Sequence, residues 1–217
     1  MSEALRIGFL FLYALCLAAV EIEIEGTHGW AERLPTWFRV SGPAARLYAV
    51  AMNGRPLTGY HLFMFVMPLF GFHLPFFEGV AWTPVGELRA LAAYLVWAIA
   101  WDYLWFILNP RFGVRRFRRG NVWWHRRAWL GPLPIDYWVG TALSIGLAAA
   151  AGLVDPAATL LHEQLRLVGG LVVLCGLTIP LAPLYHRWYR HMRREGADER
   201  GAAGIFHPDD PDTGEGR

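Results

Sequence analysis

The sequence contains no lysine, only two cysteines and none of the short motifs that mark the common enzyme classes. Cys16 and Cys175 stand far apart inside apolar stretches, so neither a disulfide framework nor a zinc-binding cysteine spacing is indicated. A Walker loop, a Cys-x-x-Cys pair and a Gly-x-Ser-x-Gly elbow are missing. The multi-histidine boxes of membrane desaturases and hydroxylases and the paired intramembrane histidines of haem proteins are missing as well. Any function must therefore be argued from less regular patterns.

The sequence is rich in long hydrophobic runs. Its 217 residues are 55% hydrophobic, which is too apolar for a soluble domain of this size. A membrane-spanning helix needs about 20 residues to cross about 30 Å of hydrocarbon, and its backbone groups must be satisfied within the segment. We therefore predict an all-α polytopic transmembrane bundle over residues 1–192, followed by a disordered polar cytoplasmic tail at 193–217. The five predicted spans are 4–24, 58–79, 87–109, 136–154 and 165–187.

The arginines are distributed unevenly over the predicted loops. With five spans, loop 25–57, loop 110–135 and the C-terminal segment share one side, and they carry four, seven and six arginines, against three on the other side. Because basic loops stay in the cytoplasm, this pattern predicts an N-terminus outside and a cytoplasmic C-terminus in a bacterial inner membrane. A cleaved signal peptide ending near Cys16 is the alternative, and it would export the first arginine-rich loop.

Three carboxylates and a histidine follow directly on the first apolar run. On a helix, Glu21, Glu25 and His28 fall on one face, and Glu25 and His28 have the Glu-x-x-His spacing of carboxylate metal sites. No second copy of that motif is present, so a symmetric di-iron site is not indicated. A solvated helix end explains these acids equally well, and Gly26 can end the helix and break the alignment with His28.

Further acids and imidazoles are predicted on the same side of the membrane. His61 begins the second span, His125 lies in loop 110–135, and Asp136 begins the fourth span. Asp102 lies about 10 Å inside the cytoplasmic end of the third span. An ionised Asp within a span costs about 3 kcal/mol, so Asp102 should face the bundle and have a partner. Structural alternatives are a carbonyl contact for His61, a Tyr, Trp or Arg pair for Asp102, a lipid headgroup for His125 and a helix N-cap for Asp136.

We expect these groups to hold one divalent metal with mixed oxygen and nitrogen ligands, namely iron, zinc or manganese. The predicted ligands are Glu25, His28, His61, Asp102 and His125. Asp102 and Glu21 are the predicted catalytic acid–base groups. Arginines interleaved with aromatics in loop 110–135 favour a headgroup-binding belt in the interface. Its predicted members are Arg115, Arg116, Arg118, Arg119, Arg126 and Arg127.

Several stretches together resemble a known family of small polytopic bacterial membrane proteins. They are Glu21–Gly26 with Gly29-Trp30-Ala31, Leu34–Trp37, Leu57–His61, Trp101–Phe106 with Asn109-Pro110, Trp124-His125 and Asp136–Trp138. The resemblance covers most of the chain up to the fourth span. No activity is attached to that family, so the resemblance implies a membrane protein and nothing about its reaction.

Three functions remain open from the sequence. The first is a metal-dependent membrane oxidoreductase or hydrolase acting on a lipid or lipid-like substrate, which predicts that the acids and imidazoles meet in one pocket. The second is a proton- or cation-coupled transporter using Asp102, which predicts a polar path to the outer face. The third is a non-catalytic membrane subunit or assembly factor. Membrane lipids are the expected partners, with a membrane protein or a second copy as a further option; the net charge of +2 gives no indication of nucleic acid.

Overall fold

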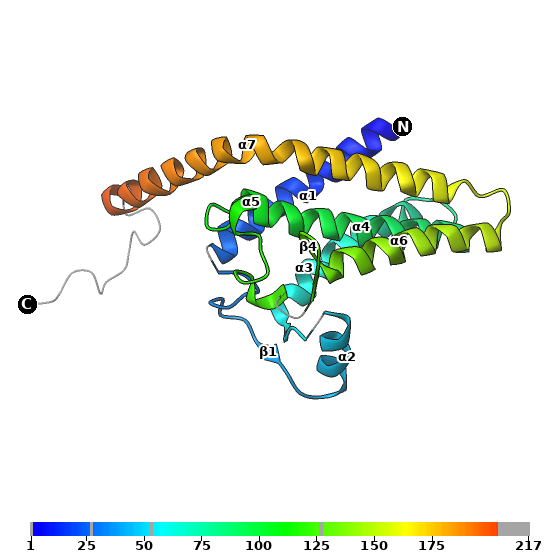
Figure 1. Cartoon of the computed structure of the whole chain (residues 1–217), viewed down its shortest axis with the longest axis horizontal. Helices are drawn as coiled ribbons and strands as arrows, with labels where there is room; N and C mark the ends of the chain where they lie inside the picture. The colour runs from blue at the N-terminus through cyan, green and yellow to red at the C-terminus, as the bar shows by residue number, and fades with distance from the viewer. Residues whose placement is uncertain (1, 27, 53, 126–127, 204–217) are drawn as a thin grey trace, which may run out of the picture.

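In the computed structural model, the described part of the chain is almost entirely helical (Figure 1). The structure describes residues 2–26, 28–52, 54–125 and 128–203. The long helices are α1 (Glu3–Glu25), α3 (Gly59–Phe77), α4 (Pro84–Leu108), α6 (Ile135–Val154) and α7 (Leu160–Ala203). All five are long and apolar enough to cross a membrane, which confirms the predicted five-span helical bundle. The first four match the predicted spans to within three residues at each end.

Local sequence signals set the ends of these helices. The Ser2 side chain accepts a hydrogen bond from the amide of Leu5 and caps the start of α1. Gly26 ends the same helix with a positive φ of 64°, a conformation that glycine adopts without a Cβ penalty. The Thr58 hydroxyl caps α3 by accepting from the amide of His61. These caps fix where the acids of α1 and the imidazole of α3 begin to face the interior.

Helix α4 lies at the centre of the bundle, in contact with α1, α3, α6 and α7. Trp97 is fully buried on α4, and its indole N–H donates to the carbonyl of Leu10 in α1 at 2.9 Å. On the other flank, the Ser144 hydroxyl of α6 donates to the carbonyl of Ala92, and Gln164 of α7 donates to Ser144. Buried polar groups paired across helices in this way hold membrane bundles together. The last turns of α4 lie in the protein interior as well, because residues 104–108 are all buried.

The shorter elements gather at the end of the bundle where α1 and α4 finish (Figure 1). They are β1 (Phe38–Arg39), α2 (Pro43–Ala51), β2 (Leu57–Thr58), α5 (Gly113–Arg116), the 3-10 turn η1 (Trp123–His125), β3 (Trp129–Leu130) and β4 (Leu133–Pro134). Two antiparallel ladders, β1 with β2 and β3 with β4, tie the loops back on themselves. Helix α2 lies in the connection between α1 and α3. Its Leu47 and Val50 side chains are exposed.

Two parts of the sequence prediction differ from the structure. The aromatics of loop 110–135 do not all form an interfacial belt, because Phe117 and Trp124 are buried against Phe106 of α4, with ring centroids 4.4 and 5.7 Å apart. Helix α7 continues to Ala203, so the first eleven residues of the predicted tail are helical. The remaining part of that prediction, 204–217, lies outside the described residues.

Candidate functional site

A cavity of about 640 Å³ lies between α1, α3, α4 and α6 at the end of the bundle that carries the short elements. Its walls bring together ionisable side chains from four helices and two loops. They are Glu21, Glu25, Arg55, His61, Asp102, His125 and Asp136. The acids and imidazoles that the sequence predicts to converge therefore line one cavity, with the exception of His28.

The first group in the cavity consists of Glu21, Glu25 and His61. All three are more than nine-tenths buried, and one ligand atom from each lies within 4.8 Å of the others. The two carboxylates are one turn apart on the same face of α1, and the imidazole comes from the first turn of α3. Two carboxylate oxygens and one imidazole nitrogen suit iron, zinc or manganese. This group could hold a metal ion.

Neighbouring groups fix how these side chains point. One Glu25 oxygen accepts from the amide of Ala31 at 2.6 Å. The His61 Nδ1 lies 2.9 Å from the Thr58 hydroxyl, and its Nε2 lies 3.8 Å from the same Glu25 oxygen. Trp30 stacks on the imidazole with 4.0 Å between ring centroids. Holding one ring nitrogen while the other faces the ligand position is the usual arrangement of metal-binding histidines.

The backbone next to this group is strained. Trp30 and Ala31 have φ values of 57° and 53°, in the left-handed region that residues with a Cβ seldom occupy. This conformation directs the Ala31 amide at Glu25 and places the Trp30 ring on His61. Strain of this kind costs on the order of 1–3 kcal/mol and concentrates at functional sites.

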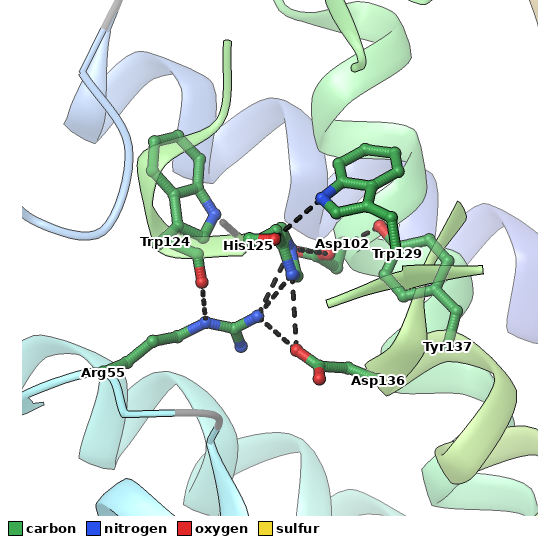
Figure 2. A network of polar contacts seen from close by, with 7 residues as sticks. All are labelled: Arg55, Asp102, Trp124, His125, Trp129, Asp136 and Tyr137. Atoms are coloured by element: carbon green, nitrogen blue, oxygen red, sulfur yellow. Dashed lines mark hydrogen bonds and ion pairs between the residues drawn. The ribbon is translucent and has the colours of Figure 1, made fainter. Parts of the chain in front are cut away.

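The second group is a polar network around Asp102 and His125 (Figure 2). The Tyr137 hydroxyl donates to Asp102 Oδ2 at 2.6 Å, and His125 Nε2 lies 3.4 Å from the same oxygen. Trp129 donates its indole N–H to the carbonyl of His125. The other ring nitrogen, Nδ1, lies 2.5 Å from an Arg55 nitrogen, which can only donate. Asp136 Oδ2 also lies 3.3 Å from Nδ1, but the closer contact is with the donor-only arginine, so we assign the ring proton to Nε2, facing Asp102.

Arg55 connects the two groups. It is buried, donates to the Trp124 carbonyl at 2.9 Å and to Asp136 Oδ2 at 2.6 Å, and lies over the Trp30 ring at 4.6 Å. Trp30 in turn stacks on His61. Its Nε and Nη2 atoms are thus engaged by the protein and position other side chains.

The residues predicted from sequence fall in three places. Glu25 and His61 lie with Glu21 in the first group, whereas Asp102 and His125 lie in the adjoining network. His28 is not among the residues that line the cavity, because α1 ends at Gly26 before it reaches that position. Asp102 has the interior partners that the sequence predicts.

The alternatives for two other residues are wrong. His125 is 1% exposed, so it does not reach a lipid headgroup. Asp136 is not a helix cap, because α6 is capped at Pro134 and the Asp136 carboxylate pairs with Arg55. The described arginines of the predicted belt are exposed and do not line the cavity; they are Arg115, Arg116, Arg118 and Arg119. Arg126 and Arg127 lie outside the described residues.

Sequence reasoning missed Arg55 and Tyr137, although both are central to the network. Arg55 stands in a loop rich in glycine and proline, where nothing local distinguishes a buried arginine from a solvated one. Tyr137 lies next to Asp136 in the first turn of α6, and only the packing of α6 on α4 directs its hydroxyl at Asp102.

Comparisons with models of known protein families, with curated proteins and with solved structures give no match. The part of the chain that the structure describes is an apolar bundle with five candidate membrane spans, and no family is identified for the protein.

Proposed function

We propose that the protein is a metal-dependent enzyme of the bacterial inner membrane that acts on a lipid-like substrate. Glu21, Glu25 and His61 are the metal ligands, and Asp102 is the acid–base group. The observation that carries the proposal is the buried Glu-Glu-His group inside a cavity that also contains a carboxylate with its own hydrogen-bonding partners. Acids and imidazoles gathered in a largely apolar cavity are the usual composition of an active site.

The balance of charge in the cavity supports a cation. Four carboxylates line it, and the one arginine is paired with Asp136. Glu21, Glu25 and Asp102 are left with two imidazoles as their only basic neighbours among the described lining residues. Ionised carboxylates removed from water are costly unless they are paired or coordinate a metal. A divalent ion between Glu21 and Glu25 neutralises two of the three charges.

Each protein group then has a definite task. A metal held by Glu21, Glu25 and His61 would supply Lewis acidity for a substrate oxygen, or for the activation of water or dioxygen. Asp102 is 36% exposed at its side chain and lines the cavity, so it can accept a proton from substrate or return one. Tyr137 and His125 hold its Oδ2 atom, and Arg55 keeps His125 in the tautomer that faces Asp102.

Metal analysis of the purified full chain tests the proposal. We expect about one divalent ion per chain in the wild type, and the loss of that ion in Glu21→Gln and His61→Ala. Glu23→Gln is the matched control, because Glu23 lies on the same helix but is exposed and paired with Arg193. Zinc would assign hydrolysis and iron would assign oxidation. A wild-type protein purified without a stoichiometric metal would overturn the proposal.

Cation-coupled transport has less support. It requires a polar path from Asp102 to the outer face, where His73 and Glu87 form a pair at 3.0 Å. Between these two points α4 presents the buried apolar side chains of Ala93, Val96 and Trp97 to the interior. A purely structural subunit is also less supported, because it predicts no convergence of acids and imidazoles. Partners among membrane proteins or a second copy remain predictions.

A further inference from the structure

The cavity extends well beyond its polar end. From Asp136 it continues between α4 and α6, where the walls are formed by Ala98, Ile99, Gly140 and Leu143. Gly140 packs so closely on α4 that a Cβ at that position would lie 2.8 Å from Ile99 Cδ1. This part of the cavity, called the apolar arm below, is lined by apolar groups of both helices.

The apolar arm opens through the side of the bundle. Val139 and Leu143 line the cavity, yet they are 50% and 56% exposed. Helices α3 and α6 pack mainly on α4, which leaves the space between them. A second hollow of about 400 Å³ shares Val139 and Leu143 with the cavity and continues along α6 past Gly146 to Leu147. In a membrane these exposed side chains face lipid, so the cavity communicates with the hydrocarbon layer.

The length of this path matches one leaflet. Asp136 and Leu147 are eleven residues apart on α6, which corresponds to about 16 Å at 1.5 Å per residue. Half of a hydrocarbon core of about 30 Å is about 15 Å. A chain whose polar end lies beside Asp102 therefore reaches the middle of the bilayer without leaving the hollow.

The charge at the polar end restricts the headgroup. Four carboxylates surround that end, and Arg55 is already bonded to Asp136, His125 and the Trp124 carbonyl. With a divalent ion held by Glu21 and Glu25, as proposed above, and with Arg55 paired with Asp136, the charge of Asp102 stays uncompensated, so a phosphate group would meet a like charge there. An uncharged hydroxyl or carbonyl head meets no such repulsion and can accept or donate hydrogen bonds.

We infer that the apolar arm binds the hydrocarbon chain of a lipid with an uncharged head, taken from the adjacent leaflet through the gap between α3 and α6. The inference rests on the proposed function for the reaction at the polar end, and it names the substrate class for that site. The observation that carries the inference concerns Leu143. This exposed side chain lines the same cavity as the carboxylates of Asp102 and Asp136.

Photolabelling of the full chain tests this inference. The protein is reconstituted in phosphatidylcholine vesicles that contain a diacylglycerol with a diazirine in its acyl chain, irradiated, and mapped by peptide mass spectrometry. We expect adducts on the interior wall at Ala98 and Ile99. Leu143→Trp, which fills the gap, should reduce these adducts by about fivefold or more, a free-energy change of about 1 kcal/mol. Leu153→Trp is the matched control, because Leu153 is 89% exposed on the same helix and lines neither hollow.

A second probe and a second variant complete the design. The same acyl chain on phosphatidylglycerol should give several-fold fewer interior adducts. Val139→Phe narrows the same gap and should also reduce the interior adducts. It replaces Leu143→Trp in the experiment if Leu143→Trp does not fold. Labelling confined to outward-facing residues, or equal interior labelling by both lipids, would overturn the inference.

The outcome is separable from that of the proposed function. Photolabelling requires neither a bound metal nor turnover. A metal-free wild type with interior labelling would end the metal proposal and leave the lipid-binding arm standing. A metal-loaded protein that is labelled only at outward-facing residues would end the lipid-binding inference and leave the metal proposal standing.

Discussion

The indole of Trp30 lies between the two halves of the site, stacked on His61 at 4.0 Å and covered by the guanidinium of Arg55 at 4.6 Å. Its N–H donates to the carbonyl of Pro56, which fixes the ring in this position. The proposed metal ligand His61 and the network around Asp102 are therefore linked through the Trp30 side chain, which has no chemical role of its own in the proposed reaction. Several consequences of this arrangement can be measured.

Replacing Trp30 by Leu should weaken metal binding by about 10- to 100-fold, the range seen when a group that orients a ligand is removed. The physical reason is that His61 loses the ring stacked on it while keeping its bond to Thr58. Competition with a chelator measures the affinity. Trp30→Phe keeps a stacking ring and should stay near the wild-type value, and equal loss in both variants would contradict a stacking role.

Replacing Arg55 by Met should destabilise the fold by about 2–3 kcal/mol. Breaking a fully buried pair costs about 3–5 kcal/mol, and Asp136 is partly exposed, which reduces the figure. Thermal unfolding in detergent measures the change. Adding Asp136→Asn should recover part of the loss, because the unpaired charge is removed.

The control for that experiment is Arg89→Met. Arg89 pairs with Glu163 at the surface, and exposed pairs contribute about 0–1 kcal/mol. A loss as large as that of Arg55→Met would mean that the assay reports removal of any arginine, and not the buried network.

Asp102→Asn should retain the metal, whereas Glu25→Gln should lose it. Asp102 is held by Tyr137 and His125 in the adjoining network, while Glu25 belongs to the Glu-Glu-His group. Elemental analysis of both purified variants gives the answer. Loss of metal in Asp102→Asn would make Asp102 a ligand, as the sequence pattern alone predicts, and would remove its role as a separate acid–base group.

Gly29→Ala should destabilise the protein by about 1–3 kcal/mol, the usual cost of inserting a methyl group into a packed region. A Cβ at this position would collide with the ring of Trp124, whose carbonyl accepts from Arg55. Chemical denaturation in mild detergent measures the change. Gly120→Ala is the control, since Gly120 is exposed and its Cβ would meet nothing within 4 Å.

The fold could be predicted from the sequence because its main signal is local. Each span is an apolar run of sufficient length, and Gly26, Thr58 and Pro84 mark helix ends. The extension of α7 to Ala203 could not be predicted in this way, because its last turns are polar and hydropathy gives no indication of a helix there. The cost of a charge in the membrane correctly placed Asp102 in the interior, with partners.

The site could be predicted only in part. Glu21 and Glu25 share a helix face by their spacing alone, and counting arginines placed His61 on the same side. The burial of Arg55 depends on how loop 25–57 folds over Trp124 and Trp30, which are distant contacts that local sequence does not encode. His28 was included by spacing, and a single glycine removes it from the helix.

The order in which the helices are made adds a constraint on biogenesis. The chain emerges with α1 first, so two carboxylates reach the bilayer before the imidazole of α3 and the central helix α4 have been synthesised. Until then the last turn of α1 has no interior to face and must remain at the water boundary. The group of Glu21, Glu25 and His61 is therefore completed late in synthesis. In a nascent chain arrested before His61, we expect a water-soluble reagent to modify both glutamates. In the finished protein we expect the same reagent to be excluded from them.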